Sequence, residues 1–266
     1  MSSERELKAT LQAGFGDVSI SAGNSSSVLN AEVDAGTTLD LTDCIDYRVR
    51  DRVGYLNMSM DCSPAHNSDG GRRHKSIHFD NLETRNWRVQ FTNAVPIAFD
   101  IELGLGKGDI DMTGLRVKDF SLSTGASSVK LRFDKPNPET IEEMNLEAGV
   151  SKFTAEGLCN ARFQHLKFDG GVGSYTLDFG GELEKEIDAD IEVGLGTLTI
   201  IIPEHTGAKL IYEKSWVAHL DLAGDFEESG TQENTYYSAN YSNAKGKINL
   251  RIDAGMGSVR IRRADW

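Results

Sequence analysis

A short glycine-centred pattern recurs along this chain, and its spacing constrains the fold more than any other sequence feature. The pattern is an apolar residue, any residue, a small or acidic residue, Gly, a small or apolar residue, Gly or Ser, and then alternating apolar residues. It surrounds Gly14, Gly104, Gly125, Gly149, Gly171, Gly194 and Gly255. From Gly104 to Gly194 the successive glycines are almost evenly spaced. A fixed period of about 20–25 residues made of strand and turn signals is typical of a solenoid.

This pattern predicts an all-β fold, a single-stranded parallel β-helix (β-solenoid) with coils of about 22 residues. Alternating apolar residues place one row of side chains inward, where stacked coils bury it. The glycine pairs permit positive φ at each corner and a close approach of backbones. Gly36 follows Gly14 at the same interval and indicates a further coil. The expected hand is right-handed, because that hand is commoner among such helices.

The chain is expected to divide into an N-terminal β region, residues 1–84, and a repeat solenoid, residues 85–266, continuous with it. Residues 63–76 are polar and predict an exposed loop. Residues 134–143 contain two prolines and predict a connection between coils. Residues 204–247 form a second excursion, which we expect to cap the solenoid end. No segment has the length and periodicity of a helix.

Composition excludes several classes of function. The 266 residues carry a net charge of −13, which repels phosphate backbones and anionic lipid, so nucleic-acid binding is not expected. The longest aliphatic run, Ile200 to Ile202, is far shorter than the ~20 residues of a membrane helix, so no transmembrane segment is expected. No basic stretch followed by an apolar one opens the chain, so either the protein is cytoplasmic or Met1 replaces a removed leader.

Three stretches resemble the toast-rack family of bacterial envelope proteins. They are residues 87–106, the repeat array Gly104 to Gly196, and residues 224–259 with the pair Asn240-Tyr241. Related folds are the "putative adhesin" β-solenoid domains and the C-terminal domain of Lia-type cell-wall-antibiotic response proteins. The resemblance implies a rigid, non-catalytic solenoid in the cell envelope, periplasmic or at the surface. It supplies no catalytic, metal or cofactor residues, and its partner would be a protein or an envelope polysaccharide.

Two glycine motifs resemble ligand-binding loops without meeting their requirements. Gly104 to Gly108 lacks the strand-to-helix setting of a phosphate loop, and the same glycines recur elsewhere, so we interpret it as a corner. Gly170 to Asp178 resembles a calcium-binding nonapeptide. That motif needs Asp where Tyr175 stands, so no calcium site is expected.

A histidine-rich segment and the cysteines are candidates for metal or redox sites. The residues with ligand chemistry are Cys62, His66, His74 and His78. Their spacing matches no standard zinc site and basic residues lie among them, so an exposed loop without metal is expected. Cys44 and Cys62 could stack on adjacent coils and form a disulfide, but we expect small buried thiols instead. Cys159 has only His165 nearby in sequence.

The remaining candidates are acidic or aromatic. A glycan-cleaving enzyme needs two carboxylates about 5–10 Å apart. The candidate carboxylates are Asp109, Asp111, Asp178, Asp188 and Asp190. They alternate with apolar residues, so they are expected on a solvated outer face. Tyr236, Tyr237, Tyr241 and Trp216 could form a binding patch or pack the excursion over the solenoid end, and we favour the second.

The sequence therefore predicts a protein that is not an enzyme and has no cofactor or metal. It would act in the envelope through surface interaction, as an adhesion-like scaffold or in envelope-stress sensing. One alternative is a carbohydrate-active β-helix enzyme that uses a carboxylate pair. Another is a self-assembling filament subunit, because an uncapped solenoid end is an adhesive parallel edge.

Overall fold

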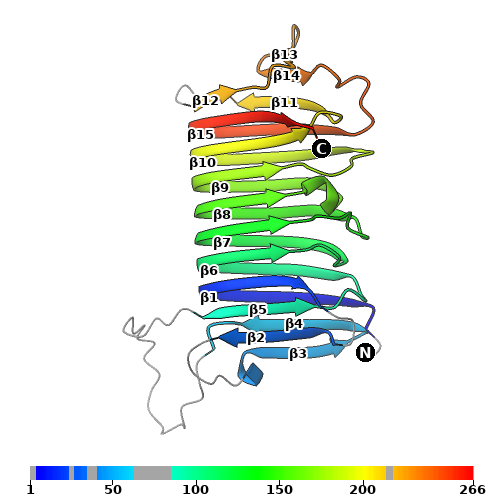
Figure 1. Cartoon of the computed structure of the whole chain (residues 1–266), viewed down its shortest axis with the longest axis vertical. Helices are drawn as coiled ribbons and strands as arrows, with labels where there is room; N and C mark the ends of the chain where they lie inside the picture. Colours follow the sequence, from blue (N-terminus) through cyan, green and yellow to red (C-terminus); the bar gives the residue numbers. More distant parts are fainter. Residues whose placement is uncertain (1–3, 24–26, 35–40, 63–84, 214–217, 266) are drawn as a thin grey trace.

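The computed structural model describes residues 4–23, 27–34, 41–62, 85–213 and 218–265, and these form a tall stack of β-strands in one sheet (Figure 1). The strands are β1 (Glu6–Ala22), β2 (Leu29–Asp34), β3 (Ile45–Arg50), β4 (Val53–Ser59), β5 (Asn86–Phe91), β6 (Ile97–Asp111), β7 (Val117–Arg132), β8 (Ile141–Glu156), β9 (Phe163–Asp178), β10 (Glu186–Pro203), β11 (Gly207–Glu213), β12 (Ala218–Asp221), β13 (Phe226–Glu228), β14 (Thr235–Ser238) and β15 (Lys247–Ala264). The described ranges also contain two 3-10 helices, η1 (Leu41–Asp43) and η3 (Leu158–Ala161). In these ranges no helix has the length and apolar character required to span a membrane.

Seven long strands make the body of the stack, in the order β1, β6, β7, β8, β9, β10 and β15, and each pairs in parallel with the next. Each of the seven repeat glycines predicted from the sequence lies in the middle of one of them. Figure 1 shows these strands turning back at one common edge, so that each forms two arms. The predicted parallel β-solenoid is therefore confirmed.

The turn in each strand follows from a change in the phase of burial. In β6, Ile101 and Leu103 are buried on the first arm, whereas Gly108 and Ile110 are buried on the second, so the inward positions switch from odd to even numbers. The core lies between the two arms. In β9, for example, the ring of Phe168 from the first arm lies 5.3 Å from that of Tyr175 in the second. The residue at the turn is left on the outside.

The strand β1 lies inside the stack and not at its end. Its residues pair with β6 on one side, through Leu7 and Ile97, and with β4 and β5 on the other. Both edges of β1 are therefore occupied, and β2, the next described strand in the chain, pairs in antiparallel with β5 and not with β1. Gly36 itself lies outside the described residues, as does the predicted loop at 63–76.

The opposite end repeats this arrangement. β15 lies between β10 and the shorter strands β11 and β12, and antiparallel β14 and β13 then cover β11. Arg263 of β15 joins the cap to the coil: its side chain is 8% exposed, forms an ion pair with Asp225 and donates to the carbonyls of Glu204 and Thr206. The excursion at 204–247 thus completes one layer of the stack and caps it.

A disulfide joins Cys44 to Cys62 near the other end, where the Cα atoms are 5.3 Å apart. The expectation of free thiols is therefore wrong. The two residues do not stack on adjacent coils; they flank the antiparallel pair β3 and β4, which brings the Cys44 carbonyl to the amide of Ser59. Hairpin pairing of this kind cannot be inferred from the spacing of the two cysteines alone.

In the coils with two glycines, the second glycine is required because successive backbones nearly touch there. Gly106 has φ of +137°, and a Cβ at this position would lie 1.9 Å from the carbonyl oxygen of Gly16 in the neighbouring coil. Gly196 repeats the situation against Gly173, with φ of +139°. The two-glycine form of the motif therefore has a steric cause.

We expect Gly106→Ala to lower the free energy of unfolding by about 2–4 kcal/mol, because the new Cβ meets a backbone atom at a φ that L-residues disfavour. The matched control is Ser127→Ala. Ser127 faces Gly106 in the next coil, already has a Cβ, and its hydroxyl has no hydrogen-bond partner in the described residues. Urea unfolding should show a change within about 0.5 kcal/mol for this control. Equal losses in both variants would contradict the steric explanation.

Candidate interaction surface

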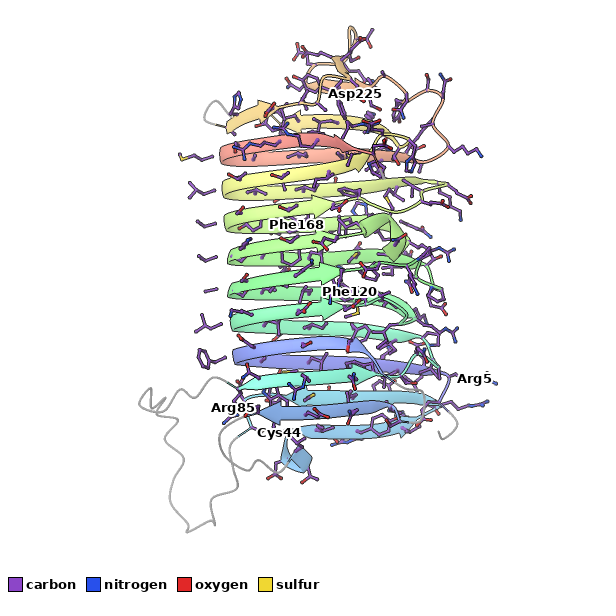
Figure 2. The ribbon with its side chains drawn as sticks, in the orientation of Figure 1. Arg5, Cys44, Arg85, Phe120, Phe168 and Asp225 are labelled. Carbon is purple, nitrogen blue, oxygen red and sulfur yellow. A yellow bond between two sulfur atoms is a disulfide. The ribbon has the colours of Figure 1, made fainter. Side chains whose placement is uncertain are left out.

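A column of apolar side chains projects from the edge at which the strands turn back, and we call it the corner ridge. Its members are Phe15, Leu105, Ala126, Val150, Val172, Leu195 and Met256, one for each long strand, and they are aligned by the strand register. The exposed fraction is 53% for Leu105, 63% for Val150 and 50% for Met256. Figure 2 shows side chains protruding along this edge.

The corner ridge is a consequence of the turn and is not needed by the core. Within each long strand, the positions that face the core switch between odd and even numbers at the turn. The residue directly after the repeat glycine, for example the one after Gly104 in β6, therefore points to solvent. Single exposed apolar residues are common on protein surfaces, but an aligned series forms a contiguous patch, and such patches often mark interaction sites. All seven coils keep a small or large apolar residue here, although Gly, Ser or Asn would suit an exposed turn better.

The two flanks of the corner ridge differ in charge. Two residues before each corner glycine lies an outward row that we call the acidic row: Glu102, Glu147, Asp169, Glu192 and Asp253, completed by Gln12 and Ser123. Two residues after the ridge lies a second row, which we call the hydroxyl row: Asp17, Lys107, Ser128, Lys152, Ser174, Thr197 and Ser258. The ridge therefore has one strongly anionic side and one side that is nearly neutral.

A shallow groove of about 400 Å³ follows the acidic row along the first arms of β8, β9, β10 and β15. Glu147, Asp169, Glu192 and Asp253 line it, together with Glu213 of β11. Its two bases already have partners, because Lys167 lies 3.1 Å from Glu143 and Arg251 lies 3.9 Å from Asp190. The groove consequently has an excess of carboxylates.

The carboxylates selected from the sequence do not converge on one site. Asp109 and Asp111 lie on a second arm and both pair with Arg132, at 3.4 and 3.1 Å. Asp188 and Asp190 lie on a first arm, where Asp188 accepts from Asn249 and Asp190 pairs with His165 at 3.3 Å. These four occupy the outer faces, as expected.

The environment of Asp178, the fifth of these carboxylates, raises its pKa. Burial has the largest effect, the amide of Gly180 donating at 2.7 Å opposes it, and the charge of Glu156 raises the pKa further. The nearby Cys159 is buried, and burial, with a smaller effect of Asp178, raises the pKa of its thiol to about 12. Such a thiol is not ionised at neutral pH, so Cys159 is not an activated nucleophile.

The other sequence candidates also have structural roles or lie outside the described residues. Gly104 to Gly108 forms the corner of β6, and Tyr175 is buried, its hydroxyl donating to the carbonyl of Gly149 at 3.1 Å. His66, His74 and His78 lie outside the described residues, while Cys62 is in the disulfide. In the described part of the chain, no three His, Cys, Asp or Glu residues are grouped as metal ligands.

The tyrosines of the excursion belong to the cap. The rings of Tyr237 and Tyr241 lie 5.0 Å apart, and the hydroxyl of Tyr241 donates to Asn249 in β15 at 3.2 Å. Lys247 lies over the ring of Tyr241 at 5.0 Å. These contacts support the cap interpretation over that of a binding patch; Trp216 lies outside the described residues.

A family model described as the N-terminal domain of toast_rack, DUF2154, matches residues 1–156 and 137–201. The chain belongs to this family. A search of curated proteins gave no match.

Two solved structures are similar to this toast_rack-family chain. One is titled a "putative cell adhesion protein" from Clostridium sporogenes, with 22% identity and a TM-score of 0.45; the match covers 98% of this chain and 94% of that one. The other is titled a "putative adhesin" from Bacteroides fragilis, with 13% identity and a TM-score of 0.34; that match covers 97% of this chain and 92% of that one.

Residue types alone do not reveal the corner ridge, because they direct attention to catalytic and metal-binding groups. A signal is present in the sequence, however. The residue after the first corner glycine is apolar in every coil, and the alternation on its two sides is out of phase by one position. A phase change of this kind requires that the apolar residue at the turn face outward.

The folded structure raises the pKa of Asp178 and lowers that of Asp111, and this difference can be tested by substitution. Because the pKa of Asp178 is raised in the folded state, its contribution to stability falls as pH rises from its ordinary value of 3.8 through the raised value. Asp178→Asn keeps an acceptor for Gly180, so it should raise the thermal midpoint at pH 7 by a few degrees. This gain should disappear as pH falls below the ordinary aspartate range.

Asp111→Asn is the matched control for this test. Burial alone would raise the pKa of Asp111, but hydrogen bonds from Thr113 and the pairing with Arg132 outweigh it and lower the pKa. Its stabilising contribution is present above the unfolded value and lost as pH falls. The control variant should therefore lower the thermal midpoint at pH 7. A shift of the same sign in both variants would contradict these assignments.

Proposed function

We propose that this chain is a non-enzymatic β-solenoid of the cell envelope that acts as an adhesion-like scaffold, with the corner ridge as its contact surface. The observation that carries the proposal is the in-register exposure of one apolar side chain for each coil. Exposed apolar area of this kind opposes solubility, at about 25 cal/mol per Å² left in water, unless a partner covers it.

Two further observations support the proposal. The Cys44–Cys62 disulfide is typical of oxidising compartments outside the cytoplasm, which supports an envelope location. The groove carboxylates are exposed to solvent, whereas the general acid of a glycan-cleaving enzyme is a carboxyl held in a desolvated site. An adhesion-like function does not need such a desolvated site, because it uses only side chains on the outer surface.

The proposal is tested by removing the ridge while keeping the coils. In the triple variant Val150→Ser, Val172→Ser and Leu195→Ser, the retention of labelled protein on isolated bacterial envelopes should fall by about tenfold or more. The free energy of unfolding should change little, because these side chains lie outside the core.

The matched control is Thr154→Ser, Thr176→Ser and Thr199→Ser, which removes three methyl groups from the second arms of the same three strands. It should bind like the unaltered chain. Retention that is equal in the ridge variant and the control would contradict the proposal. Cleavage of neutral or acidic glycans by the unaltered chain, lost on Glu147→Gln, would establish an enzyme instead.

A further inference from the structure

We propose that the corner ridge and the acidic row together bind a cationic amphipathic helix of a partner polypeptide, lying along the solenoid axis across β8, β9, β10 and β15. This inference rests on the proposed function and specifies the chemistry of the partner. It combines two independent features, one apolar and one charged, that occupy the same four strands.

The apolar feature supplies the contact area. Val150, Val172, Leu195 and Met256 stand on four successive strands and are 43% to 63% exposed. Parallel strands in a sheet are about 4.8 Å apart, so the four side chains form a straight line about 14 Å long. Together with Leu105, Ala126 and Phe15 the line extends over seven strands. A partner that covers it must be elongated and carry its own apolar stripe.

The charged feature identifies the sign of the partner. Glu147, Asp169, Glu192 and Asp253 lie on the same four strands and, among the described residues, none of them forms an ion pair. Like charges opposite one another on adjacent strands repel and destabilise the pairing. Lysine or arginine side chains placed beside this row would remove that repulsion. On the other flank the same strands present Lys152 and three hydroxyls, so the attraction acts on one side only.

The groove gives these cations a place to bind. It runs beside the ridge on the first arms, and its own bases, Lys167 and Arg251, are paired with Glu143 and Asp190. A helix on the ridge would direct the lysines at one border of its apolar stripe into this groove. The hydroxyl row, whose only charged residue on these four strands is Lys152, would face the other border.

The repeat distance favours a helix over a strand as the occupant. A helix presents an apolar residue once in each turn of about 5.4 Å, close to the ~4.8 Å between coils, so the mismatch reaches only about 2 Å over three intervals. An extended segment along the same axis presents a side chain on one face about every 6.6–6.8 Å. It would lose register with the ridge after one or two coils.

Charge argues against the other occupants of an apolar edge. A second copy of this chain carries the same net charge of −13, and an antiparallel pairing of two ridges would place the two acidic rows side by side. An anionic membrane surface is repelled for the same reason. A cationic helix is the occupant that satisfies both the apolar line and the carboxylates.

The probe is a synthetic peptide of about 20 residues, made of leucine and lysine with leucines at helical spacing, and its dissociation constant is measured by fluorescence anisotropy. The variant Glu147→Gln, Asp169→Asn, Glu192→Gln and Asp253→Asn should weaken binding at least tenfold. The ridge triple variant should weaken it as well. Because the four carboxylates repel one another, the quadruple variant should be as stable as the unaltered chain or more stable, so failure to fold would not mimic the result.

The matched control removes four charges elsewhere: Glu182→Gln, Glu184→Gln, Glu227→Gln and Glu228→Gln, all outside the groove. It has the same net charge as the groove variant and should bind the peptide within about threefold of the unaltered chain. Equal weakening in the two quadruple variants would show diffuse charge attraction and overturn the proposal. So would equal affinity for a scrambled peptide of the same composition, which lacks an apolar stripe.

Further measurements would show whether a different occupant binds the ridge, and would distinguish failure of the helix proposal from failure of the proposed envelope function. Ridge-dependent dimerisation in sedimentation, or ridge-dependent binding to vesicles of phosphatidylcholine with one-fifth phosphatidylglycerol, would assign the ridge to a second copy or a membrane and overturn the inference. If the groove variant keeps full envelope retention while the ridge variant loses it, the proposed function stands and the cationic partner is rejected.

Discussion

The approach of backbones at the turn is the constraint on which the rest of this structure depends. At several corners the peptide of one coil lies so close to the next that an added Cβ, at Gly104, Gly106 or Gly196, would come within 2.4 Å of a carbonyl oxygen. That closeness keeps the strand ladder in register around a sharp bend, so both arms can stack without interruption. The sharp bend also leaves the residue between the two turn positions, such as Leu105 between Gly104 and Gly106, on the outside. The corner ridge consists of these residues.

Much of the coil could be predicted from the sequence, because its determinants are local. The period, the alternation and the glycine pairs fix where each strand bends and which side chains are buried. The order of the coils is not local: β1 pairs with β6, which lies several coil lengths further along the chain. Nothing in the motif of Gly14 distinguishes this neighbour from the segment that follows directly. The Cys44–Cys62 disulfide is equally hard to predict, since it depends on the hairpin of β3 and β4.

The candidate surface is less predictable than the fold because no reactive residue marks it. The five aspartates chosen from the sequence lie on different arms and have structural partners, which no spacing rule reveals. The phase change in the alternation indicates one outward apolar residue in each coil, but only the register of the strands shows that these residues form one line with the acidic row beside it. Insertion of both terminal strands into the stack also bears on folding. β6 to β10 pair with sequence neighbours, whereas β1 and β15 join strands that are distant in the sequence, so the central array is expected to form first.

The outer ends of the two terminal long strands, β1 and β15, lie away from the corner ridge. β1 begins at Glu6 and turns at Gly14, while β15 turns at Gly255 and ends at Ala264, so both ends lie about 26–30 Å from the ridge. Figure 1 shows them on the edge opposite the turns. Any segment joined to either end would therefore leave the solenoid from this edge and not from its caps. The corner ridge and the outer ends of β1 and β15 thus lie on opposite edges of the molecule, so a segment joined to either end would leave all seven coils of the ridge uncovered.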